Sequence, residues 1–186
     1  YRITRDGNSF ASKLVQVIKI GFVEELDYWK SYSGTTDVRP YGNFVVDTDH
    51  SKLYAFTMRD RDSVTRYFKF DLPKAADGTY SQVYGANVVT LQIGDIESWF
   101  DCEYSRFLQG ACYHDNKIYS LEGFNYSPNT EKPGKLKVID LEKQEQLCNI
   151  DLHEIGLDAE PEFMEYYNGI FYYSDSSGKV VAFISH

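Results

Sequence analysis

Short runs of alternating apolar and polar residues follow one another along nearly the whole chain, and helical periodicity is almost absent. The runs are rich in Tyr, Phe, Val and Ile, and they are separated by Gly, Asn, Asp and Ser, which favour tight turns. This pattern predicts β-strands joined by hairpins. The runs fall into three groups of the same layout: residues 42–47, 52–57 and 65–72; residues 110–115, 117–121, 135–141 and 146–152; and residues 162–167, 169–175 and 179–184.

The three groups are spaced like the units of a repeat protein. Tyr54, Tyr119 and Phe171 occupy matching places, and they are separated by 65 and 52 residues. Four antiparallel strands that recur along a chain are typical of a β-propeller, in which each blade packs against its neighbours. We therefore expect an all-β fold made of β-propeller blades, each a four-stranded antiparallel sheet. The chain would supply about three blades of a ring of about five to seven.

In this strand layout the chain resembles the six-bladed propellers of the NHL and TolB-like kind. The resemblance covers most of the chain and implies a propeller scaffold. The Trp-Asp dipeptide that marks WD40 blades is absent from the sequence, which disfavours that class.

The strands do not divide evenly into blades. We expect residues 88–93 to be the fourth strand of the first group and residues 94–103 to be an acidic insertion between strands. Residues 1–4 and 13–20 resemble the outer strands of a further blade. Three blades are too few to close a ring. We therefore expect one domain over residues 1–186, forming the C-terminal half of a larger propeller, and the alternative is self-association of chains to complete the ring.

Charge and composition exclude some classes of partner. The chain has 28 acidic and 19 basic side chains and a formal net charge of −9, whereas nucleic-acid binding needs a concentrated basic face. No apolar stretch approaches the length of about 20 residues that a membrane-spanning helix needs. We expect neither nucleic acid nor membrane as a partner, and we favour a bacterial protein exported to the periplasm or the cell exterior.

Propeller topology indicates which polar residues converge. The connections into the first strand of each blade, and those from the second strand to the third, lie on one face of a propeller. The hairpin turns at residues 49–51, 115–116 and 168–169 lie on the other face and are typical of plain turns. The sequence therefore predicts a site for a small molecule or a glycan at the channel mouth. Its candidate binding residues are Arg39, Tyr41, Asn43, Arg59, Gln109, Glu122, Glu160 and Glu162.

Glu160 and Glu162 leave two functions open. They could bind a cation, for which Ca²⁺ is the best match to oxygen ligands, and no other cofactor is expected. They are also the candidate catalytic residues of the alternative function, a carbohydrate hydrolase or lyase in which Arg39 orients an anionic group. Arg39 could equally form an ion pair with either glutamate. We place binding first, because a glycosidase needs two carboxylates about 5–10 Å apart across the bond, which the sequence does not establish.

Overall fold

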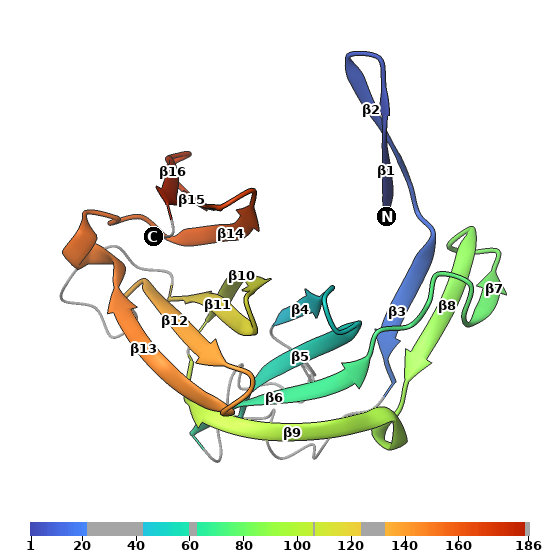
Figure 1. Cartoon of the computed structure of the whole chain (residues 1–186), viewed down its shortest axis with the longest axis horizontal. Coiled ribbons are helices and arrows are strands. Elements are labelled where there is room, and N and C mark those ends of the chain that lie inside the picture. The colour runs from blue at the N-terminus through green and yellow to red at the C-terminus, as the bar shows by residue number, and fades with distance from the viewer. Residues whose placement is uncertain (22–42, 60–62, 106, 124–132, 185–186) are drawn as a thin grey trace.

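The computed structural model describes residues 1–21, 43–59, 63–105, 107–123 and 133–184. The described chain is all-β, with two short 3₁₀ turns at Ile93–Asp95 and Leu152–Ile155. Its strands form several separate sheets, and none of these sheets closes on itself (Figure 1). The expected all-β class is confirmed.

Three antiparallel sheets form the body of the molecule. Sheet 1 contains β4 (Asn43–Asp47), β5 (Lys52–Arg59), β6 (Val64–Asp71) and β9 (Ile96–Glu103), in that order. Sheet 2 contains β10 (Leu108–His114), β11 (Lys117–Glu122), β12 (Lys135–Asp140) and β13 (Glu145–Asp151). Sheet 3 contains β14 (Pro161–Tyr167), β15 (Ile170–Asp175) and β16 (Val180–Ile184). The sheets therefore follow the three groups that the sequence predicts.

The first strands of the three sheets, β4, β10 and β14, are neighbours in space, and the later strands lead away from them (Figure 1). Two-residue turns join β10 to β11 and β14 to β15. Asp115 and Asn116 have φ values of 47° and 57°, and Asn168 and Gly169 have 50° and 83°. Positive φ at both central residues belongs to the type I′ turn, whose twist matches that of the strands. The hairpin turns predicted at these places are confirmed.

Apolar side chains fill the spaces between adjacent sheets. Between sheets 1 and 2, Tyr67 stacks between Phe56 and Phe100 and packs in one cluster with Ile118 and Ile139. A second cluster joins sheets 2 and 3. It includes Cys112, Leu121, Leu152, Met164, Phe171 and Tyr173. Alternation along each strand directs apolar residues to both faces, so each sheet can pack against a neighbour on either side.

The fourth strand of sheet 1 differs from the sequence prediction. Ile96–Glu103, expected to be an insertion, forms the long strand β9 and pairs with β6. Residues 88–93 were expected to be the fourth strand of sheet 1. Most of them lie in β8 (Ala86–Leu91), which belongs to a separate side sheet with β3 (Gln16–Ile20) and β7 (Thr79–Ser81). The prediction was wrong because the buried Phe100 and Cys102 alternate with the exposed Trp99, Asp101 and Glu103. Negative charge on the exposed face made the run look like a loop.

The N-terminal region also differs from expectation. β1 (Arg2–Asp6) and β2 (Ser9–Lys13) pair with each other in a hairpin, and β3 pairs in parallel with β8. Residues 1–4 and 13–20 are therefore not two adjacent strands of one antiparallel blade. Leu91 of β8 packs with Leu53, Phe68 and Phe70 of sheet 1, so the side sheet covers part of the face of sheet 1 that points away from sheet 2.

Candidate functional site

The two ends of the first strands carry different chemistry. We call the end where β4, β10 and β14 begin the entry end, and the end where hairpins lead into the second strands the turn end. The sequence prediction placed the ligand at the entry end.

Hydrogen bonds tie polar side chains together at the entry end. The Gln109 side-chain amide donates to the Gly123 carbonyl at 3.0 Å and to Glu160 Oε1 at 2.9 Å. Asn43 donates its own amide to the carbonyl of Gln109. Asn43 and Gln109 lie in sheets 1 and 2, and Glu160 directly precedes the first strand of sheet 3, so this chain of hydrogen bonds braces all three sheets.

Gly110 lets two of these strands approach closely. A Cβ atom at Gly110 would lie 2.8 Å from both the Glu162 carbonyl oxygen and Phe163 Cα. Both β10 and β14 have an irregular register at this level, between Leu108 and Ala111 and between Pro161 and Phe163. Glycine at this position therefore brings Gln109 within reach of Glu160.

Glu122 takes part in a separate, buried network at the same end. It lies at the end of β11, is 6% exposed, and has its Oε2 atom 3.4 Å from Lys137 Nζ. Lys137, 1% exposed, also donates to the carbonyls of Glu103 and Tyr104 and to Ser105 Oγ. Burial raises the pKa of Glu122, and the positive charge of Lys137 opposes that rise. This network holds sheet 2 against the end of β9.

Four predicted residues remain: Arg39, Tyr41, Arg59 and Glu162. Glu162 is exposed on β14. Arg59 ends β5, where its backbone pairs with Val64. Arg39 and Tyr41 lie outside the described residues, so the proposed pairing of Arg39 with a glutamate stays a prediction. No group of three or more His, Cys, Asp or Glu side chains within the described ranges is placed to hold a metal ion, and the Ca²⁺ site likewise stays a prediction.

The turn end contains a cavity of about 560 Å³ between the three first strands. Its lining includes Asp49, Tyr113, His114, Asp115, Glu165 and Tyr166. Among the residues that the structure describes, the lining combines aromatic rings with three carboxylates and includes neither lysine nor arginine. The sequence prediction missed this cavity because each hairpin turn, taken alone, has ordinary turn chemistry.

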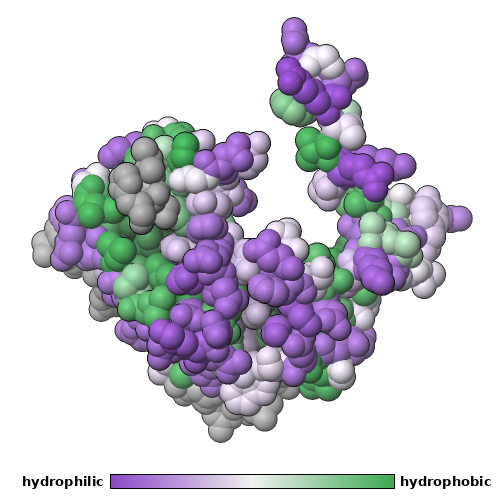
Figure 2. Space-filling model, in the orientation of Figure 1, coloured by the Kyte–Doolittle hydropathy of each residue, from purple (hydrophilic) through white to green (hydrophobic). Residues whose placement is uncertain are grey.

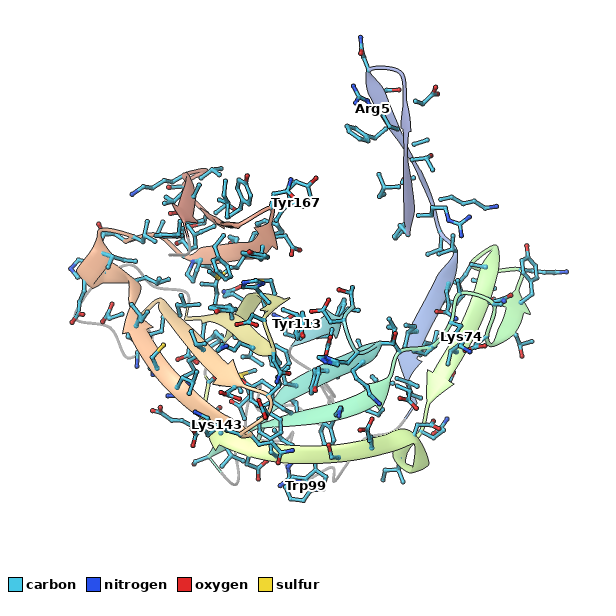
Figure 3. All side chains as sticks on the ribbon, viewed as in Figure 1. Arg5, Lys74, Trp99, Tyr113, Lys143 and Tyr167 are labelled. Atoms are coloured by element: carbon cyan, nitrogen blue, oxygen red, sulfur yellow. The ribbon has the colours of Figure 1, made fainter. Side chains whose placement is uncertain are left out.

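An aromatic wall borders the cavity. The rings of His114 and Tyr166 stack with their centroids 3.4 Å apart, and Phe171 meets His114 edge-on at 5.6 Å. Tyr113, labelled in Figure 3, lies near the centre of the body, and its hydroxyl is 3.4 Å from Asp49 Oδ2. Burial and then the negative charge of Asp47 raise the pKa of Tyr113, so this hydroxyl stays protonated at neutral pH.

Local hydrogen bonds shape the turns around the cavity. Asp47, 1% exposed, accepts from the backbone N–H of His50 at 2.9 Å, and its second oxygen lies 2.8 Å from His50 Nδ1. Lys117 Nζ lies 3.3 Å from Asp115 Oδ2. Asp49 and Glu165 are exposed and line the cavity. These two carboxylates give it a negative potential.

Comparison with known proteins assigns no family. No protein-family model matches the chain, and no curated protein matches it. Among solved structures, a GH43 glycoside hydrolase with an engineered active site, described as displaying both endo-xylanase and exo-arabinofuranosidase activity, is similar at 10% identity and a TM-score of 0.49. That similarity covers 90% of this chain, which spans only 30% of the hydrolase chain.

Two computationally designed proteins are also similar in structure. The Ika4 protein has 8% identity and a TM-score of 0.36, with 90% of this chain and 96% of that chain covered. The Ika8 protein has 9% identity and a TM-score of 0.35, with 80% and 47% covered. Similarities at this level assign no activity or ligand to the chain. No helix among the described residues is long and apolar enough to cross a membrane.

Proposed function

We propose that the chain is part of a β-propeller binding module, and that it holds a polar small molecule or glycan in the cavity at the turn end. Two features support the propeller: the repeated antiparallel sheets and the adjacency of their first strands. The cavity carries the proposal for binding, since its volume of about 560 Å³ lies within the range of small-ligand sites.

The lining indicates the kind of ligand. The apolar face of a sugar packs well against aromatic rings such as those of His114 and Tyr166, and carboxylates accept hydrogen bonds from hydroxyl and amino groups. Asp49, with Asp115 beside it in the lining, favours a ligand that carries a positive charge over one that carries a negative charge. We therefore propose a hydroxylated ligand with a cationic group, such as an amino sugar.

Three sugars of matched shape test this proposal. Glucosamine, glucose and glucuronic acid share a pyranose ring and differ in charge. Titration calorimetry, with saturation-transfer NMR for weak binding, should rank glucosamine above glucose and glucose above glucuronic acid. Failure of all three sugars to bind, or a preference for glucuronic acid, would contradict the proposal.

Paired variants then locate the ligand. Tyr166→Leu keeps the apolar bulk that packs on Phe171 but removes the ring that stacks on His114, so it should abolish sugar binding, whereas Tyr166→Phe should retain it. Glu160→Gln changes the entry end and should leave the affinity unchanged. If Glu160→Gln abolished binding while Tyr166→Leu retained it, the ligand would belong at the entry end.

A further inference from the structure

The β1–β2 hairpin projects from the body of the molecule (Figure 2). All residues of its two strands are exposed, including Ile3 at 61% and Phe10 at 74%. An isolated two-stranded hairpin is marginally stable in water at best. Large exposed apolar side chains on such a hairpin indicate that it packs against another surface.

The register of the hairpin divides its side chains between two faces. Arg5 pairs with Phe10 and Ile3 pairs with Ser12, and directly opposed residues share a face. Because residues alternate along each strand, one face carries Ile3, Phe10 and Arg5. The opposite face carries Thr4 and Ala11 together with the charged residues Arg2, Lys13 and Asp6. The first face is thus apolar with one positive charge.

Sheet 3 has an exposed face of complementary character. Met164 and Tyr166 pack toward sheet 2, so Glu165 and Tyr167 of β14 point the other way. In the cross-strand register Glu165 pairs with Tyr172, and Ser174 pairs with Val180. Tyr167 is 65% exposed and Val180 is 70% exposed. None of the apolar clusters formed by the described residues includes this outer face.

The two surfaces also carry opposite charges. The hairpin strands contain three basic side chains and one acidic one, although the whole chain is strongly acidic. They are Arg2, Arg5, Lys13 and Asp6. In sheet 3 Glu162 and Glu165 are exposed, Asp175 is buried, and the three strand sequences have no lysine or arginine. Figure 3 shows Arg5 on the hairpin and Tyr167 at the end of β14, separated by an open gap.

We propose that the hairpin of one copy of this chain packs on the outer face of sheet 3 of a second copy. Phe10 and Ile3 contact Tyr167 and Val180, and Arg5 pairs with Glu165. If each copy both gives a hairpin and receives one, the contact closes into a symmetric dimer. The separation of the hairpin from sheet 3 within one chain favours an intermolecular contact.

Substitutions in the hairpin test the proposal without disturbing the packed sheets. Size-exclusion chromatography with light scattering, across a wide concentration range, should show the full chain as a dimer in equilibrium with monomer. Phe10→Ser should weaken the dimer by about tenfold or more, because it removes a large apolar side chain from the contact. Ala11→Ser, on the other face of the hairpin, should leave the dimer unchanged.

Charge exchange tests the pairing itself. Arg5→Glu and Glu165→Arg should each weaken the dimer, and the double variant Arg5→Glu/Glu165→Arg should restore much of the affinity because the charges are again opposite. A chain that stays monomeric at every concentration would overturn the proposal. So would a dimer that Phe10→Ser and Arg5→Glu leave intact, since some other surface would then form it.

Discussion

The two ends of the first strands differ in how their polar groups are used. At the entry end, the amide of Gln109 donates to Gly123 and Glu160, and Glu122 is buried against Lys137. At the turn end, Asp49 and Glu165 are exposed and line a cavity. Polar groups that bond to one another hold sheets together, whereas polar groups that face a cavity remain available to a ligand. The convergence of polar residues in a sequence-based prediction therefore does not tell whether they hold sheets together or bind a ligand.

The largest effect on stability should come from breaking the buried pair at the entry end. Lys137→Met leaves the Glu122 carboxyl buried without its cation, which should lower the free energy of unfolding by about 3–5 kcal/mol near neutral pH. Chemical denaturation monitored by fluorescence would measure this loss. Lys143→Met in an exposed turn is a control and should change stability by less than about 0.5 kcal/mol.

The buried pair of Glu122 and Lys137 predicts that the stability of the fold depends on pH. Burial raises the folded-state pKa of Glu122 above its unfolded value, so the folded chain holds this proton more tightly. The resulting stabilisation is present at low pH and is lost as the pH rises through the folded pKa. Lys137→Met raises the pKa of Glu122 further. The loss in free energy of unfolding that this substitution causes should therefore be small in acid and should grow toward neutral pH. A cost that is independent of pH would show that the lost contacts of Lys137, rather than the charge of Glu122, dominate.

Close approach of β10 and β14 should make Gly110 the next most sensitive position. Gly110→Ala would place Cβ against backbone atoms of β14, which cannot rotate away, and should cost about 1–3 kcal/mol. Gly94→Ala is a matched control, because no atom lies within 4 Å of its Cβ position. Thermal unfolding of both variants would compare them. Equal melting temperatures would mean that the strands separate at little cost.

The local sequence pattern predicts much of the fold but only part of the candidate site. Alternation and turn residues predict the sheets and the hairpin turns between their first and second strands, because these depend on neighbouring residues. The same topology brings Gln109 and Glu160 to one end, as predicted. The place of β9 depends on pairing with β6 across the long β7–β8 insertion, which no local signal reveals. The cavity depends on three turns that are distant in sequence, so no single motif marks it.

Removing the brace at the entry end should affect stability and leave binding unchanged. Gln109→Ala removes the hydrogen bonds to Gly123 and Glu160 and should cost about 1–2 kcal/mol. Its affinity for glucosamine should match that of the unaltered chain. Asp49→Asn should show the reverse pattern, with unchanged stability and weaker binding. If both variants changed both quantities, the two ends would not be independent.

The smallest expected effect is a difference in glucosamine affinity between substitutions of two carboxylates, Asp115 and Asp49, in the same cavity. Lys117 Nζ already lies 3.3 Å from Asp115, whereas Asp49 lies 3.4 Å from the neutral hydroxyl of Tyr113. Asp115→Asn should therefore weaken glucosamine binding less than Asp49→Asn, and both changes should stay below about fivefold because exposed ion pairs contribute little. Asparagine also accepts the positive φ of 47° at position 115, so the turn is preserved. Calorimetry at low and high salt would separate the two variants, since added salt should reduce the difference between them. An equal loss from both substitutions would mean that Lys117 leaves Asp115 when the ligand binds.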